Sequence, residues 1–440
     1  MSARSLATAA LLLAGCSHEA RPSIVLVVAD TLRADHLSVY GYERETSPEL
    51  EKWSSRAVVF ESAHATSPWT LPSMASLLTG EIPSRHLAGA IVSIDGRDEY
   101  LGLSPTTPTL AQELQREGYA TAAFVTNPYL RPAFGLDRGF DHYDHAPAEN
   151  DSIRRAGAVV ELALDWMAKQ EGPVFALVHL FDPHMDYDPA AQDRGRFRED
   201  DAPVTGVHEL RDGAADVSPE ERARIAAAYD EELLAVDRAV GRLLEVLDGD
   251  GFLGEGALFF TADHGEELFD RGGFEHGHSM HREVLGVPLL VWGPELEPAR
   301  VAGAVSIADL APTIRDWVGV KGDTFGTSFL SALRGRGLAP RDVVAEMNLY
   351  GLQQKMLLRG TDKIICDPTG SYGRLFDVAA DPGERTNLSG SGRERFHELA
   401  YDLVKLVRTE AQEREGASKV RIDLSTVEEL RALGYLDSVE

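Results

Sequence analysis

Runs of mostly apolar residues recur along this 440-residue chain, and they constrain its fold more than any other feature. The first run, residues 23–29, follows Pro22 and ends at Asp30. Such a strand needs cover on both faces, which is typical of the parallel sheet of an α/β protein. Helical patterns separate the runs, so we predict an α/β fold with a mostly parallel central sheet flanked by helices. The other runs are residues 57–60, 121–125, 174–181, 257–260 and 287–292, and the helical segments are 109–116, 156–169 and 219–247.

The pattern changes near residues 333–341, which are rich in Gly and Arg. Beyond them we predict short strands and two helices, and therefore a division of the chain. A large domain is expected over residues 22–340, and a small α+β subdomain over residues 341–440. The polar segment 190–217 is expected to be a surface loop. The short strands are predicted at 343–347, 354–359, 362–366 and 374–376, and the helices at 392–414 and 425–433.

The first fifteen residues have the features of a signal peptide. Arg4 precedes a short apolar run, residues 6–13, which is too short to span a membrane. The sequence Leu-Ala-Gly-Cys that ends at Cys16 resembles a bacterial lipobox, which implies cleavage before Cys16 and lipidation of that cysteine. We therefore expect residues 1–15 to be removed and 16–21 to tether an exported, lipid-anchored protein to the bacterial cell envelope. An ordinary secretory signal is the alternative. After processing, Cys366 has no intrachain partner for a disulfide.

The charge balance excludes one class of partner. The formal net charge is −28 at pH 7, so we expect no binding to nucleic acid. An anionic substrate would need a local positive site, such as a metal ion, to offset this field.

The segment 67–80 joins a predicted strand to a predicted helix and carries a candidate nucleophile. Thr70 lies at or just before the start of the helix, where free N–H groups and the helix dipole favour an anion. A hydroxyl at such a place suits attack on an acidic ester. Helix capping is the alternative role for this residue.

Polar residues gather where the predicted strands end. Asp30 ends the first run, Asp263 and His264 follow the run 257–260, and Thr70 follows the run 57–60. Sites in open α/β sheets lie at the carboxyl ends of strands, so we expect these side chains to meet. Two carboxylates, an imidazole and a hydroxyl suit a divalent metal, and the imidazole favours Zn or Mn over Ca. Such an ion would lower the pKa of the Thr70 hydroxyl and polarise an ester.

Four further histidines lie near strand ends: His179, His184, His276 and His278. Their open roles are a second metal site, anion binding, or proton donation to a leaving group. The number of metal ions therefore stays open.

Six motifs in the same order resemble those of the sulfatase family, in the alkaline phosphatase superfamily. The resemblance covers almost everything from Pro22 onward and implies the same fold. The motifs are VADTLRADH at 28–36 with SVYGY at 38–42, TLPS at 70–73 with LLTG at 77–80, TADHGEE at 261–267, GVPL at 286–289, FDVAADPGE at 376–384, and LRALGY at 430–435.

The chain departs from the sulfatase pattern at the positions of the nucleophile, the metal ligands and the substrate-binding residues. Sulfatases convert a Cys or Ser to formylglycine, whereas Thr70 stands here, with Met74 where the motif has Arg. Thr31 stands where the opening motif has a second Asp, and His264 where many sulfatases have Asn. Residues 126–131 contain no Lys-x-His match.

The set of Asp30, Thr70, Asp263 and His264 instead resembles that of the superfamily's phosphoester hydrolases and phosphotransferases. This resemblance implies that the four residues hold one metal and that Thr70 attacks phosphorus to form a covalent intermediate. His184 and His278 would then hold the free oxygens of the ester or assist the leaving group. Asn127 and His276 are further substrate-binding candidates.

The predicted function is therefore metal-dependent hydrolysis of a phosphate, phosphonate or sulfate ester through Thr70. Three alternatives are a true sulfatase, a transferase that moves a phosphoryl-linked group onto an envelope lipid or glycan, and a non-catalytic binding lipoprotein. Retention of all four site residues argues against the last. The natural substrate and the oligomeric state stay open.

Overall fold

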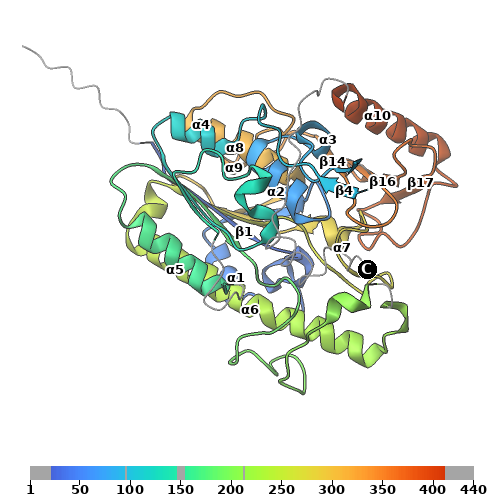
Figure 1. Ribbon diagram of the computed structural model, residues 1–440, viewed down its shortest axis with the longest axis horizontal. Helices are drawn as coiled ribbons and strands as arrows, with labels where there is room; N and C mark the ends of the chain where they lie inside the picture. The colour runs from blue at the N-terminus through green and yellow to red at the C-terminus, as the bar shows by residue number, and fades with distance from the viewer. Residues whose placement is uncertain (1–20, 95–96, 146–153, 212–213, 412–440) are drawn as a thin grey trace, which may run out of the picture.

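The computed structural model describes residues 21–94, 97–145, 154–211 and 214–411 (Figure 1). Its centre is a nine-stranded sheet with β1 (Ile24–Ala29) in the middle. Two parallel neighbours flank it, β8 (Ala257–Ala262) and β7 (Val174–Leu180), and β5 (Ala120–Phe124) and β6 (His142–Asp144) follow in parallel beyond β7. All six residues of β1 are fully buried. The predicted α/β fold with a mostly parallel central sheet is confirmed.

The other side of the sheet is mixed. The predicted strand 287–292 is two strands, β11 (Gly286–Val287) and β12 (Leu289–Trp292), and both run antiparallel to β2 (Val58–His64). Pro288 separates them because it has no N–H for the sheet. The edge strand β13 (Ala299–Ser306) pairs in parallel with β2 and was not predicted. Most of its residues are exposed or half-buried, and its sequence is rich in Ala and Gly, which are uncommon in strands.

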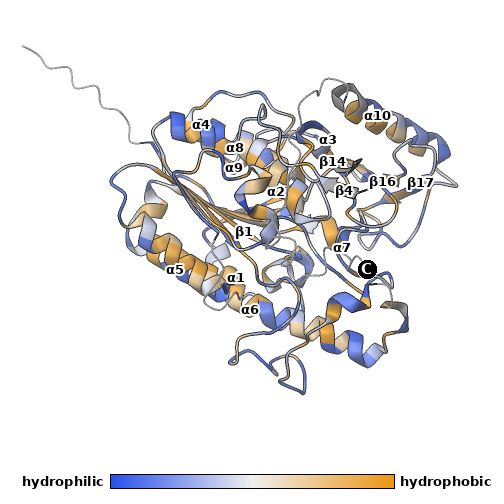
Figure 2. Ribbon diagram, in the orientation of Figure 1, coloured by the Kyte–Doolittle hydropathy of each residue, from blue (hydrophilic) through white to orange (hydrophobic). Residues whose placement is uncertain are grey.

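Helices cover both faces of the sheet (Figure 1). On one face, α6 packs against α1 and α5, and on the other α2 packs against α4 and α8. Apolar and polar residues alternate along these helices (Figure 2), and Leu50, Leu77, Val159, Leu243 and Ile314 enter the main core. The side chains of Thr109 and Ser218 cap the first turns of α4 and α6. The bounds are α1 Pro48–Ser54, α2 Thr70–Thr79, α3 Pro83–His86, α4 Leu110–Arg116, α5 Ala156–Met167, α6 Pro219–Gly249, α7 Arg282–Leu285, α8 Leu310–Val318 and α9 Leu330–Leu333.

A four-stranded antiparallel sheet follows in the order β14-β15-β16-β17, and α10 (Arg393–Ala411) packs on it. The strands are β14 (Asp342–Glu346), β15 (Lys355–Arg359), β16 (Asp362–Cys366) and β17 (Gly373–Asp377). Alternate residues of β14 join the two parts, because Val343 and Ala345 enter the main core while Val344 enters the core beneath α10. The division at residue 340 itself stays a prediction.

The remaining elements are short. Strands β3 (Ile91–Ile94) and β4 (Arg97–Tyr100) pair, as do β9 (Glu267–Leu268) and β10 (Phe274–Glu275). The segment 190–217, predicted to be a loop, contains two short 3-10 helices, Val207–Leu210 and Ala214–Asp216.

Several predicted features lie outside the described residues. These are the leader 1–15, Cys16 with the rest of the tether up to residue 20, and the helix 425–433. No helix in the described part of the chain combines the length and apolarity that crossing a membrane requires.

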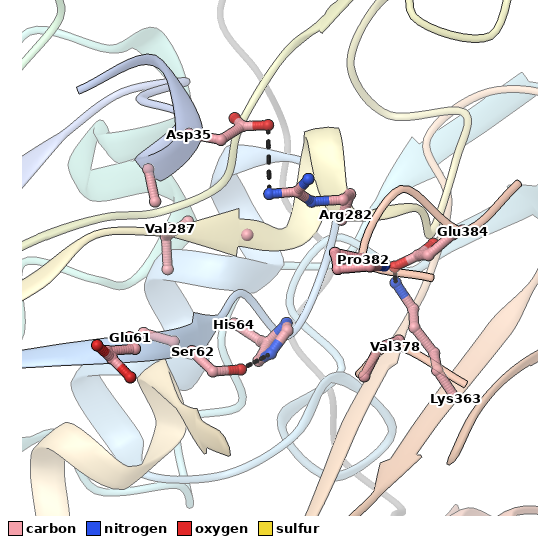
Figure 3. A pocket seen from close by; sticks show the side chains of 13 residues that line it. Asp35, Glu61, Ser62, His64, Arg282, Val287, Lys363, Val378, Pro382 and Glu384 are labelled. Carbon is pink, nitrogen blue, oxygen red and sulfur yellow. Dashed lines mark hydrogen bonds and ion pairs between the residues drawn. The ribbon is translucent and has the colours of Figure 1, made fainter. Parts of the chain in front are cut away.

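A cavity of about 280 Å³ lies beside β2, between the main sheet and the C-terminal sheet (Figure 3). Its cations are paired with carboxylates: Arg282 lies 3.4 Å from Asp35, and Lys363 lies 2.6 Å from Glu384. None of the residues predicted for catalysis lines it.

Candidate active site

The carboxyl ends of three neighbouring strands bring together two carboxylates and two imidazoles. Asp30 follows β1, while Asp263 and His264 follow β8, so the strand pairing places these side chains side by side. His179 comes from β7, where it lies opposite Val28 in register. All four side chains are completely buried. The sheet thus concentrates metal-binding groups at one point, as the sequence predicts for Asp30, Asp263 and His264.

Thr70 is the first residue of α2, which agrees with its predicted place at or just before the start of the helix. Ser73 of the same helix donates its hydroxyl to the backbone carbonyl of Asp263 at 2.5 Å, which fixes the helix against the end of β8. Thr70 Oγ1 then lies 3.4 Å from His264 Nε2 and 3.3 Å from Asn127 Nδ2. The hydroxyl therefore belongs to the same buried cluster.

The two carboxylates repel each other in a buried place. Burial, and then the charge of Asp263, raise the pKa of Asp30 well above its usual range. Asp30 Oδ1 and Asp263 Oδ2 have no hydrogen-bond partner among the described residues, nor does either ring nitrogen of His179. Buried polar atoms without partners are costly, and a cation between them would satisfy both carboxylate oxygens and one nitrogen of His179.

The donor set fits a divalent ion. One ligand atom each from Asp30, His179 and Asp263 lie within 4.8 Å of one another. His264 Nε2 lies 3.4 Å from Asp263 Oδ2 and 3.7 Å from Asp30 Oδ1. Such separations are longer than typical hydrogen bonds and suit atoms that share a metal ion.

His264 presents a lone pair to this cluster. Its Nδ1 lies 2.9 Å from the carbonyl oxygen of Gly265, which can only accept, so Nδ1 carries the proton. In the neutral ring, Nε2 then has the lone pair and faces Thr70 and both carboxylates.

Asn127 bridges two members of the cluster. Its amide donates to Asp30 Oδ2 at 2.6 Å and to Thr70 Oγ1 at 3.3 Å, and its oxygen accepts from the amide of Tyr129. In this arrangement both of its N–H groups are engaged. Asn127 thus lies beside Asp30 and Thr70, and its predicted contact with substrate would require one of these bonds to break.

The other predicted histidines lie in a second layer. The ring of His276 lies 4.6 Å from that of His264 and 5.2 Å from that of His184. His276 Nδ1 pairs with Glu266 Oε1 at 2.9 Å. Burial lowers the pKa of His184 to about 3 and that of His276 well below its usual range, which makes both rings neutral at pH 7.

His278 differs from the other two because its side chain is 26% exposed. Its Nε2 lies 2.9 Å from Glu267 Oε2. Burial lowers the pKa of His278, but Glu267 outweighs that effect and the net shift is upward. The amide of Gly277 donates to the carbonyl of Pro68 at 2.8 Å, which ties this segment to the strand–helix turn of Thr70.

Two site residues were not assigned roles from the sequence. In the sequence, His179 is one of several histidines with open roles, and Glu266 lies inside a motif without a role of its own. Burial, together with the charges of Glu275 and Asp30, raises the pKa of Glu266 well above its usual range. The signal for Glu266 was its position two residues after His264, beside the Asp263 strand end.

Comparisons with known proteins agree with this architecture. The sequence profile of the Sulfatase family matches residues 22–320. An arylsulfatase of Clostridium perfringens is 22% identical over 469 residues, which covers 90% of this chain and 95% of that protein.

Two solved structures have the same fold. A 2-O GAG sulfatase superposes with a TM-score of 0.73 at 20% identity, covering 90% of this chain and 95% of that one. The phosphonate monoester hydrolase of Silicibacter pomeroyi superposes with a TM-score of 0.68 at 19% identity, covering 92% of this chain and all of that one (100%). Because the profile spans most of the chain, this protein belongs to the sulfatase family of ester-hydrolysing enzymes, whose members generally use a divalent metal ion.

Proposed function

We propose that this protein hydrolyses a phosphate or phosphonate ester, with Thr70 as the nucleophile beside a divalent metal ion. The observation that carries the proposal is the position of Thr70 Oγ1, buried at the start of α2 and 3.4 Å from His264 Nε2. Asp30, Asp263, His264 and Thr70 would hold the ion, with Zn or Mn favoured over Ca by the imidazole. When bound, the ion would lower the pKa of the hydroxyl and polarise a phosphoryl oxygen.

The chain's own groups account for the rest of the reaction. Asn127 keeps Thr70 Oγ1 aimed at the cluster, and the amino end of α2 favours the anionic ester. Thr70 Oγ1 loses its proton to solvent and forms a bond to phosphorus as the bond to the leaving oxygen breaks. Water then attacks the phosphoryl or phosphonyl ester of Thr70, its oxygen leaves with the phosphate or phosphonate, and one of its protons restores the Thr70 hydroxyl.

His278 is the proposed proton donor to the leaving oxygen. Its partial exposure lets a substrate reach it, and Glu267 favours its protonated form. His184 and His276 are neutral and suit hydrogen bonds to the free oxygens of the ester. His278 therefore suits acid catalysis better than either of them.

Hydrolysis of a sulfate ester is the second candidate, supported by the arylsulfatase and GAG sulfatase among the similar proteins. Against it stands Thr70, because a threonine side chain cannot be converted to a simple aldehyde. The phosphonate monoester hydrolase of Silicibacter pomeroyi has the same fold, and this likeness supports the first candidate.

The test compares four substrates with one protein, residues 17–440 loaded with Zn or Mn. They are nitrophenyl phosphate, bis-nitrophenyl phosphate, a nitrophenyl phenylphosphonate and nitrophenyl sulfate. We expect turnover of the phosphorus esters, retention of activity in Thr70→Ser, and loss of at least about 1,000-fold in Thr70→Ala. Preferred turnover of the sulfate would overturn the phosphoester assignment, and unchanged activity in Thr70→Ala would overturn the nucleophile.

The site of action is proposed from the leader. We propose that the chain is exported and anchored through lipid on Cys16, at the periplasmic or extracellular face of a bacterial envelope. Radiolabelled palmitate should enter the wild-type protein in a bacterial host and should not enter Cys16→Ser. Labelling of Cys16→Ser, or none in the wild type, would contradict the anchor.

A further inference from the structure

We propose that His179 is a direct ligand of the metal ion, on the opposite oxygen of Asp30 from His264. This inference rests on the proposed metal site and adds to it the imidazole of a residue on β7, the strand beside β1. The site would then contain two carboxylates and two imidazoles around the Thr70 hydroxyl.

Each oxygen of the Asp30 carboxylate lies near a different imidazole ring. Oδ1 of Asp30 lies 3.7 Å from His264 Nε2, and Oδ2 lies 3.7 Å from His179 Nε2. Two ligand atoms at about 2.1 Å from a tetrahedral ion are about 3.4 Å apart. The spacing therefore matches a shared ion better than a direct hydrogen bond.

The buried ring of His179 lacks the hydrogen bonds that usually hold a structural histidine in place. A buried histidine normally donates from one ring nitrogen and accepts at the other. Neither nitrogen of His179 has a hydrogen-bond partner among the described residues, although the side chain is fully buried. Binding an ion through Nε2 would give the ring an interaction that compensates its burial.

His86 shows what a structural histidine looks like in this fold. It is also fully buried, but its Nδ1 accepts from the amide of Ala88 at 3.1 Å, and its Nε2 lies 3.0 Å from Ser76 Oγ. Both ring nitrogens are thus satisfied by the protein. The contrast singles out His179 as a ring that needs a ligand.

The residue after Asp30 is Thr31, and it supplies no carboxylate or imidazole to the site. Thr31 offers only a hydroxyl, and its backbone amide donates to Asp263 Oδ1 at 3.3 Å. A second imidazole in the set would strengthen the preference for Zn or Mn over Ca, which takes oxygen ligands.

The experiment counts imidazoles on a bound ion. The protein of residues 17–440 receives one equivalent of Cu²⁺, and electron spin-echo envelope modulation reports the number of coordinated imidazole rings. We expect two rings in the wild type, one in His179→Gln, one in His264→Gln, and none in the double variant. The affinity for Zn²⁺, measured by calorimetry, should fall at least about tenfold in His179→Gln.

Two controls guard the interpretation. His86→Gln removes a buried imidazole that both its partners satisfy, and it should keep two coordinated rings and the wild-type Zn²⁺ affinity. His179→Asn is a second replacement, and circular dichroism confirms that each variant is folded before copper is added.

The possible results separate this inference from the proposed function. One ring in the wild type that persists in His179→Gln and disappears in His264→Gln would overturn the role of His179 while the metal site stands. A wild type that binds no equivalent of Cu²⁺ or Zn²⁺ would overturn the metal site and this assignment together.

Discussion

Asn127 donates its side-chain amide to the carboxylate of Asp30 at 2.6 Å, inside the completely buried cluster. This bond lowers the pKa of Asp30, against the larger effects of burial and Asp263. Asn127 therefore offsets part of the cost of holding two carboxylates together without an ion.

Replacing the amide of Asn127 by a third carboxylate should make the stability of the protein depend on a bound metal ion. We expect Asn127→Asp to lower the free energy of unfolding of the metal-free protein by about 1–3 kcal/mol, because repulsion replaces a hydrogen bond. Saturating Zn²⁺ should recover most of that loss, measured by urea denaturation with and without the ion.

A matched control is Asn348→Asp. Asn348 is buried, but its amide donates to the backbone carbonyls of His278 and Leu352. This variant should lose stability without recovery by metal. Equal recovery of both variants would contradict the role given to Asn127.

Asp263→Asn should change stability in opposite directions with and without metal. The substitution keeps Oδ1, which accepts from the amides of Thr31 and His264, and removes the charge that repels Asp30. We expect a higher melting temperature than wild type in EDTA. The rise in melting temperature that Zn²⁺ causes in the wild type should disappear. A lower melting temperature in EDTA would count against repulsion between the two carboxylates.

Glu267→Gln should move the basic limb of the pH–rate profile. Glu267 raises the pKa of His278, so the protonated ring persists to higher pH, and donor activity falls as pH rises through this raised value. Removing the carboxylate should shift the limb of kcat to lower pH for esters with poor leaving groups. Nitrophenyl esters serve as the control, since their leaving group needs no proton. An unmoved limb would exclude His278 as the donor.

The ion pair of Lys363 and Glu384 should make the free energy of unfolding fall at acidic pH. Burial opposes ionisation of Glu384, but Lys363 and His281 outweigh it and lower its pKa to about 2. The pair's stabilisation is therefore complete above about pH 4.5, the unfolded value, and is lost as pH falls toward 2.

The cost of burying Lys363 limits how much free energy of unfolding is lost when Glu384 is protonated. Burial also lowers the pKa of Lys363, although Glu384 acts in the opposite direction, so the pair holds its ammonium at a cost. We expect about 1–3 kcal/mol of the free energy of unfolding to be lost between pH 5 and pH 3 in the wild type. Glu384→Gln should start less stable and show a flatter profile in urea titrations. A profile as steep as the wild type's would place the acid sensitivity elsewhere.

The parts of the fold that the sequence predicts are those that depend on local patterns. Strands β1, β7 and β8 are mostly apolar, and α6 combines a Ser218 cap with a long apolar stripe. Edge strand β13 escapes prediction because its residues face solvent, and β12 takes an antiparallel direction that no local pattern encodes.

By itself, the sequence determined that Asp30 and Asp263 end buried strands and that Thr70 starts a helix, because strand length and helix initiation follow from neighbouring residues. Only the tertiary structure decided that His179 meets Asp30 and that Asn127 joins Asp30 to Thr70. Those contacts depend on the order and register of strands far apart in the chain, which are set by packing of the whole sheet.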